Sequence, residues 1–255
     1  MASIKNIPLV KRTGPPAISH LWLFQRVLLL GAGVLMLVNM YLIFMWAPTE
    51  AVMGHVQRIF YIHVPLAWLS FLAFFVVFLG SVLYLWKRNS TWDMLASSAA
   101  EIGVVFTTLV LITGPIWAKP VWGIWWTWDV RLTTTLVLWL IYVGYLMLRA
   151  YSDNRSQGAT YSAVLGVVGF IDVPIVYYAV NWWETQHQRL VIGAGTMESS
   201  GLNGNMRMTL YFSLLAFIFL FSYLMWDRMI MKRTEEDLRA AKYSARLTNL
   251  SDVRG

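Results

Sequence analysis

Five tryptophans are gathered in one short stretch of this 255-residue chain, and two charged residues close it. The tryptophans are Trp117, Trp122, Trp125, Trp126 and Trp128, and the charged residues that follow them are Asp129 and Arg131. The stretch lies between two long apolar segments, where tryptophan is common because its ring is apolar and its N–H needs a hydrogen-bond partner. An aromatic belt explains one or two such rings at a helix end. A packed row closed by an aspartate and an arginine instead favours a flat, amphipathic ligand.

Histidines supply candidate metal ligands near this row. Three of the four, His55, His63 and His187, lie on the same predicted side of the membrane as the tryptophans, and His20 lies on the other. Neutral imidazole is a common metal ligand, although a lone histidine at a helix end is more often structural. Pro65 suits the first turn of a helix, which predicts that His63 lies at the outer start of a span. His55 has less apolar surroundings, so His63 is the preferred candidate.

Haem is the ligand class that fits these residues together. Axial histidines approach the iron from opposite faces of the ring and therefore come from different segments, as His63 and His187 do. Tryptophan rings can cover the porphyrin, and Arg58 and Arg131 suit its propionates because guanidinium meets carboxylate in a paired geometry. Asp129 can hold Arg131 or a tryptophan N–H in place. An interfacial ion pair that merely ends the loop explains Asp129 and Arg131 equally well.

Composition and hydropathy predict the fold that positions these side chains. The chain is 58% hydrophobic and 13% charged, with a mean hydropathy of +0.57, which indicates a multi-spanning membrane protein. A helix of about 20 apolar residues crosses the bilayer core and satisfies its own backbone. We therefore expect an all-α bundle of six transmembrane helices within residues 27–227, an outer tryptophan-rich loop at 117–133, a cytoplasmic segment 1–26 and a cytoplasmic basic tail 228–255. The six spans are expected at about 27–46, 64–86, 96–118, 132–150, 160–180 and 208–227.

Basic residues predict the orientation of the bundle. Fifteen of the 20 lysines and arginines lie before the first span, in the loops 87–95 and 149–159, and in the tail. The positive-inside rule places these parts in the cytoplasm and the loops 47–63, 119–131 and 181–207 outside. Because topology explains the net charge of +7, nucleic-acid binding is not expected. The absence of cysteine excludes disulfides, thiolate metal sites and covalent haem capture through a C-x-x-C-H motif.

The tryptophan row resembles the "WWD" signature of the haem-handling proteins of cytochrome c biogenesis. The residues that carry it are Trp122-Gly123-Ile124-Trp125-Trp126-Thr127-Trp128-Asp129, and the continuation Val130-Arg131-Leu132-Thr133 resembles the CcmC (haem exporter protein C) family. The six-span size is similar to that family, and so is the pair Trp182-Trp183 followed by His187-Gln188. The resemblance covers about residues 20–230.

This resemblance implies a function and a set of partners. In that family a pair of outer-face histidines holds the iron of haem b (iron protoporphyrin IX), and by motif these are His63 and His187 here. The tryptophan loop presents the haem to the periplasmic haem chaperone CcmE. CcmD and the ATP-binding-cassette pair CcmA and CcmB complete a complex in the bacterial inner membrane. The sequence has no G-x-x-x-x-G-K-[ST] loop, so we expect any ATP hydrolysis to belong to another subunit. The resemblance implies a haem-delivery protein that is not an enzyme.

Two other functional classes stay open at the level of sequence. A b-type electron-transfer subunit usually carries its ligating histidines within its spans, and no predicted span has a histidine in its middle. A transporter with a midplane site is suggested by Asp172, which precedes Pro174 in the fifth span. For Asp172 we prefer a structural hydrogen-bond role to a place in the haem cavity. Glu101, in the third span, lies near the cytoplasmic interface.

Overall fold

All named elements of the chain are helical in the part that the structure describes, which is residues 17–183, 185, 187 and 202–252. The computed structural model contains α1 (Ala17–Tyr41), α2 (Phe60–Lys87), α3 (Ser90–Trp122), α4 (Val130–Tyr151), α5 (Arg155–Gly169), α6 (Asp172–Trp182) and α8 (Gly204–Asp252), with two short turns, η1 (Leu42–Trp46) and η2 (His55–Ile59). Helices α5 and α6 follow one another within a single span. Six stretches are therefore long and apolar enough to cross a bilayer, and the predicted all-α bundle of six spans is confirmed.

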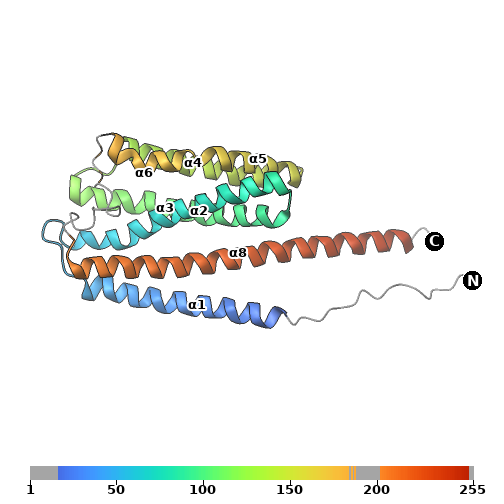
Figure 1. Cartoon of the computed structure of the whole chain (residues 1–255), viewed down its shortest axis with the longest axis horizontal. Helices are drawn as coiled ribbons and strands as arrows, with labels where there is room; N and C mark the ends of the chain where they lie inside the picture. The colour runs from blue at the N-terminus through green and yellow to red at the C-terminus, as the bar shows by residue number, and fades with distance from the viewer. Residues whose placement is uncertain (1–16, 184, 186, 188–201, 253–255) are drawn as a thin grey trace, which may run out of the picture.

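The helices run roughly along one axis in two groups (Figure 1). Helices α2 to α6 form the larger group, and α1 pairs with α8 alongside α2 and α3. The start of α1 and the end of α8 lie at one end of the bundle, which we call the tail end. The connection from α1 to α2 and the connection from α3 to α4 lie at the opposite end, which we call the site end.

Helices α2 and α3 approach each other closely because small residues face the partner helix. A Cβ atom on Gly103 would lie 2.6 Å from the ring of Phe74, and one on Gly80 would lie 3.0 Å from the Cβ atom of Ala96. Phe74 in turn stacks on Tyr142 of α4, with the ring centroids 3.8 Å apart and the planes 11° from parallel. These contacts make α2, α3 and α4 the frame on which the site is built.

The fifth span is two helices and not the single helix that we predicted over residues 160–180. Helix α5 ends at Gly169, α6 begins at Asp172, and Pro174 lies in the first turn of α6. Proline has no N–H with which to continue the helical ladder, but it fits a first turn. The carbonyl of Phe170 instead accepts from the N–H of Val173 at 3.1 Å. Pro174 thus explains why the span is interrupted at this point.

Glu101, which the sequence placed near an interface, is paired with two cations of α8 at the tail end. Its carboxylate accepts from Nε of Arg228 at 2.6 Å and from Nζ of Lys232 at 2.8 Å. Asp93 of α3 accepts in the same way from Nη2 of Arg149 of α4 at 2.7 Å. Ionisable groups within membrane spans are commonly satisfied by such pairing. These pairs fasten α8 and α4 to α3, which gives Glu101 a structural role.

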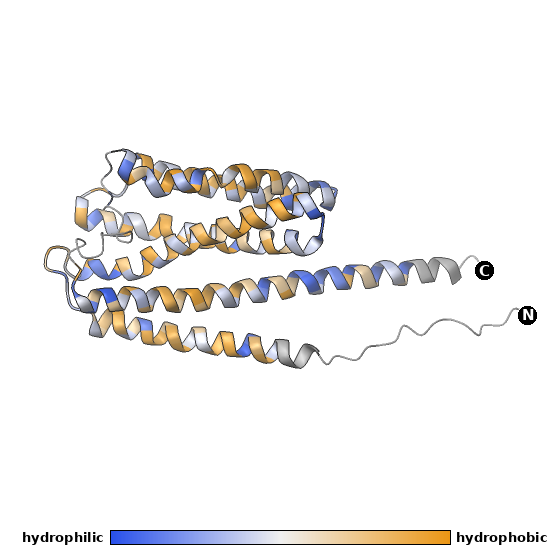
Figure 2. Cartoon of the chain, viewed as in Figure 1, coloured by the Kyte–Doolittle hydropathy of each residue, from blue (hydrophilic) through white to orange (hydrophobic). Residues whose placement is uncertain are grey.

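Helix α8 continues without interruption beyond residue 227, where we predicted that the last span ends, to Asp252. Figure 2 shows that α8 is largely hydrophobic over its first half and more hydrophilic toward its C-terminal end. The change in hydropathy, and not a change in backbone, therefore marks where the apolar span gives way to the basic tail.

Candidate functional site

Two histidines far apart in the sequence line the same internal space at the site end. His63 lies in the first turn of α2, and His187 lies beyond the end of α6. Both line two adjoining cavities of about 50 and 20 Å³. The residues that line both cavities are His63, Gly114, Pro115, Leu132 and His187. The structure thus brings together the two histidines that the sequence singled out.

The start of α2 differs from the prediction. We expected Pro65 in the first turn of the second span, but α2 begins at Phe60, so Pro65 lies inside the helix. The 3-10 turn η2 leads directly into α2 and supplies the residues before it. His63 is therefore a helical residue with a fixed backbone, and its side chain is only 8% exposed.

Each of the two histidines has a tryptophan edge-on beside it. The ring centroid of Trp117 lies 5.9 Å from that of His63, and the centroid of Trp122 lies 5.6 Å from that of His187. Both tryptophans lie on α3, which continues to Trp122 and does not end near residue 118 as predicted. Gly123, with φ 79°, adopts the left-handed conformation that ends a helix, and its N–H bonds the carbonyl of Lys119 at 3.0 Å.

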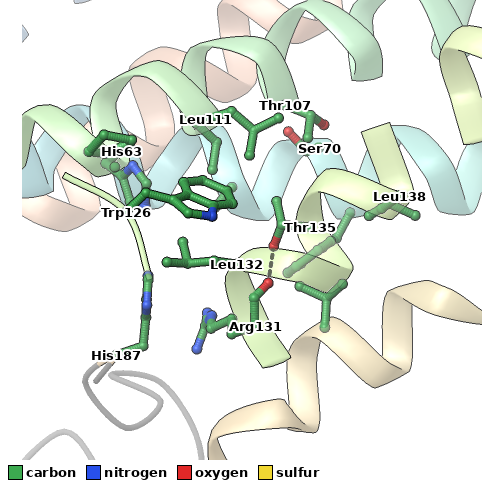
Figure 3. Close-up of a pocket in the computed structure, with 16 residues that line it drawn as sticks. His63, Ser70, Thr107, Leu111, Trp126, Arg131, Leu132, Thr135, Leu138 and His187 are labelled. Atoms are coloured by element: carbon green, nitrogen blue, oxygen red, sulfur yellow. Dashed lines mark hydrogen bonds between the residues drawn. The ribbon is translucent and has the colours of Figure 1, made fainter. Parts of the chain in front are cut away.

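The segment that connects α3 to α4 is therefore 123–129, which is shorter than the predicted loop 117–133. Its three tryptophans differ in their exposure and in whether they line a cavity. Trp126 lines the first cavity beside His63 (Figure 3), and its Nε1 has no hydrogen-bond partner among the described residues. Trp125 lines the second cavity although its side chain is 58% exposed. Trp128 lines neither cavity, is 76% exposed and lies edge-on to Trp126 at 5.7 Å. The row thus has a cavity-lining part and an exposed part.

Asp129 caps a helix and does not pair with Arg131. Its Oδ1 accepts from the N–H of Leu132 at 2.9 Å, and its Oδ2 accepts from the hydroxyl of Thr127 at 3.1 Å. This is an N-cap, which satisfies a donor that the first turn of α4 would otherwise leave unpaired. The ion pair that we considered for Asp129 and Arg131 is absent from the described part of the chain. Asp129 therefore marks the end of the loop by capping the first turn of α4, and not by an ion pair.

Arg131 is left as a cation in the wall of the first cavity (Figure 3). It lines this cavity together with His63, Trp126 and His187. No carboxylate lies within 4.0 Å of its guanidinium among the residues that the structure describes. An anionic group that enters the cavity would therefore meet an unpaired guanidinium, which is suited to two-point pairing with a carboxylate.

Electrostatics keep His187 neutral. Burial, and next the charge of Arg131, lower the pKa of His187 to about 4, while Asp129 acts in the opposite direction. The imidazole is therefore uncharged at neutral pH and has a lone pair available for a metal. Its Nδ1 is buried and has no hydrogen-bond partner among the described residues.

Thr113 is a site residue that sequence reasoning missed. Its Oγ1 lies 2.8 Å from Nδ1 of His63. In the sequence it is only a polar residue in an apolar run, two positions before Pro115. Its contact with His63 depends on how α2 packs against α3, which hydrophobic periodicity does not specify.

Other residues that we considered lie away from the two cavities. Arg58 and His55 belong to η2 and line neither cavity, and the guanidinium carbon of Arg58 lies 5.9 Å from the ring centroid of Phe44. His20 lies in the first turn of α1, at the tail end. Of the two arginines that we predicted as propionate ligands, Arg131 lines the cavity and Arg58 does not.

The fold and the site define a multi-pass membrane protein with a paired-histidine, tryptophan-lined cavity at one end of its bundle. A family model described as "Heme exporter protein C" matches residues 15–244. The match extends over nearly all of the described helices. The chain belongs to the haem exporter protein C (CcmC) family.

Individual relatives agree with this family. The chain is 40% identical to the "Heme exporter protein C" of Bradyrhizobium diazoefficiens over 66% of its own length and 65% of that protein. It is 39% identical to a "Putative cytochrome c biosynthesis ccmC-like mitochondrial protein" of Marchantia polymorpha, over 56% of the chain and 60% of that protein. It is 36% identical to the "Heme exporter protein C" of Escherichia coli, over 73% of the chain and 74% of that protein. The matched part is thus less than two thirds of the first two relatives.

Proposed function

We propose that this chain holds haem b between His63 and His187 and delivers it to the haem chaperone CcmE during the biogenesis of c-type cytochromes. One observation carries the proposal: two histidines distant in sequence line one cavity, and each has a tryptophan beside it. Haem iron takes two axial ligands from opposite faces of the ring. The names of the relatives, which refer to haem export and cytochrome c biosynthesis, support this ligand and this pathway.

The other lining residues fit the remaining parts of haem. Trp117, Trp122 and Trp126 offer aromatic surface to the porphyrin, and the unpaired guanidinium of Arg131 suits a propionate. Bound haem supplies the reactive iron, and the residues of this chain hold and orient it. Because the cavities are small, the proposal requires the lining side chains to separate when the ring enters. The segment 123–129 lies between α3 and α4, so its movement would not break either helix.

The same proposal covers the location of the site and its partners. The positive-inside rule supports a periplasmic site end in a bacterial inner membrane, and the exposed Trp125 and Trp128 stand where a periplasmic chaperone meets the haem. CcmD, CcmA and CcmB complete the complex. Since the sequence has no phosphate-binding loop, ATP hydrolysis falls to the partners, and this chain delivers haem and is not an enzyme. A contribution of Arg58 to propionate binding stays a prediction.

A visible absorption spectrum of the purified full-length protein tests the proposal. We expect the signal of a six-coordinate, low-spin haem in the parent protein. His63→Ala and His187→Ala should each abolish that signal, because each removes an axial ligand. His55→Ala and His20→Ala are matched controls that should retain it, since neither residue lines the cavities. An unchanged spectrum in the His63/His187 double variant would overturn the proposal.

A midplane transport site has weaker support. Asp172 lies at the break between α5 and α6, and its Oδ2 has no partner among the described residues. Discontinuous helices are common at transporter sites, and an ionisable group within a span is often functional. However, Asp172 lines neither of the cavities that hold the histidines. The haem-delivery function therefore explains more of the observed geometry.

A further inference from the structure

We infer that Thr113 is a positioning residue that fixes the proton on Nδ1 of His63 and so presents the lone pair of Nε2 to the haem iron. The inference rests on the proposed function, because it assumes that His63 is an axial ligand. Thr113 is on α3 and His63 is on α2, and the contact between them joins the two most closely packed helices of the frame.

The direction of the hydrogen bonds follows from a count of protons. Oγ1 of Thr113 lies 2.7 Å from the carbonyl oxygen of Leu109 and 2.8 Å from Nδ1 of His63. A carbonyl can only accept, and two oxygen atoms 2.7 Å apart repel each other unless a proton lies between them, so the single hydroxyl proton of Thr113 points to Leu109. The contact with His63 is then a hydrogen bond only if Nδ1 carries a proton and donates it. A neutral imidazole protonated on Nδ1 has its lone pair on Nε2.

The ring of His63 is also held in place by neighbours of Thr113 on the same helix. A Cβ atom on Gly114 would lie 3.5 Å from Cε1 of His63, so the backbone of α3 passes close to the ring. Trp117, one turn further along α3, lies edge-on to the ring. Helix α3 therefore sets both the tautomer and the orientation of His63. Hydrogen bonds of this kind to a metal-bound histidine fix its orientation and raise its basicity as a ligand.

The test replaces Thr113 by its isostere in the full-length, haem-loaded protein. Thr113→Val removes the acceptor while keeping the shape. We expect haem to dissociate to a scavenger protein about 10- to 100-fold faster. We also expect the reduction potential to rise, because a less basic imidazole stabilises ferric iron less. Thr113→Ser keeps the hydroxyl and should restore both values to those of the parent.

Thr134→Val is the matched control. Thr134 makes the same type of bond to the carbonyl four residues earlier, at 2.7 Å to Val130, and lines neither cavity. It should leave the potential and the dissociation rate unchanged. If Thr113→Val behaves like Thr134→Val while His63→Ala still abolishes the low-spin signal, the inference fails and the proposed function stands. Equal losses in Thr113→Val and Thr113→Ser also overturn the inference. If His63→Ala leaves the spectrum unchanged, the proposed function fails as well.

Discussion

Trp122 lies edge-on against His187, with the ring centroids 5.6 Å apart and the planes at 60°. The tryptophan is the last residue of α3, whereas the histidine lies five residues beyond the end of α6. Trp122 therefore connects His187, which is outside the named helices, to the helical frame. Because edge-on aromatic contacts have a preferred geometry, the tryptophan orients the imidazole as well as covering it.

Replacement of Trp122 by alanine should weaken haem binding without unfolding the protein. An aromatic pair contributes about 0.5–1.5 kcal/mol, so we expect a loss in affinity of about two- to tenfold. Haem dissociation to a scavenger protein measures this loss. Trp86→Ala, which removes a 77% exposed ring from the tail end of α2, is the control and should change nothing. If the two variants had equal effects, Trp122 would only pack at the membrane interface and would not contribute to haem binding.

Arg131→Met should separate ligand binding from stability. A charge-assisted hydrogen bond contributes about 1.5–3 kcal/mol, which corresponds to an affinity loss of about 10- to 100-fold. The haem-free protein should unfold at the same temperature or higher, because the substitution removes a cation that has no carboxylate partner among the described residues. Haem titration and thermal unfolding measure the two quantities. Arg207→Met removes a charge from α8 outside the cavities and should leave the affinity unchanged. A loss of stability without a loss of affinity in Arg131→Met would contradict this role.

Substitutions at Asp129 distinguish a helix cap from a ligand. Removal of the cap in Asp129→Ala should lower the free energy of unfolding by about 0.5–2 kcal/mol, as measured by denaturant or heat. Asp129→Asn should retain most of that stability, since asparagine caps about as well as aspartate. If Asp129→Asn is stable yet loses haem as severely as Asp129→Ala, then the charge of the carboxylate contributes to haem binding. Capping of α4 would then not be the whole role of Asp129.

The pairing of Glu101 predicts a stability effect that is separate from haem binding. Glu101→Gln leaves the cations of Arg228 and Lys232 without their shared carboxylate. The pair is partly exposed, so we expect a loss of about 1–3 kcal/mol, between surface and buried ion pairs. Thermal unfolding measures the loss, and addition of Lys232→Met should recover part of it. The haem spectrum should stay that of the parent, and a change in it would show coupling between the two ends of the bundle.

Much of the fold could be predicted because a segment that crosses lipid must satisfy its own backbone hydrogen bonds, and an α-helix does so. Hydropathy alone predicts the six spans and the position of the tryptophan row between the third and fourth of them. The ends of helices were less well predicted. Helix α3 runs on to Trp122 because Gly123 ends it, and the fifth span breaks at residues 170–171, just before the turn that contains Pro174. Such details depend on local hydrogen bonds that hydropathy does not report.

The site was predictable in its residue types but not in its contacts. His63, His187 and Arg131 were expected near the tryptophans from their residue types and the topology, and the structure places them around one cavity. The contact of Thr113 with His63 and the capping role of Asp129 were not predicted. The first depends on the register between α2 and α3, and the second on the conformation of a short loop. Neither leaves a periodic pattern in the sequence.

Helix α8 has a length that the bilayer does not require. Its 49 residues form a rod of about 70 Å at the usual rise per residue, whereas the hydrocarbon core is about 30 Å thick. About 40 Å of this length is therefore not needed to cross the core, which is more than the thickness of the core itself. A protein bound to the C-terminal end of α8 would therefore meet the chain farther from His63 and His187 than the hydrocarbon core is thick, and could affect the haem site only through the helices between them.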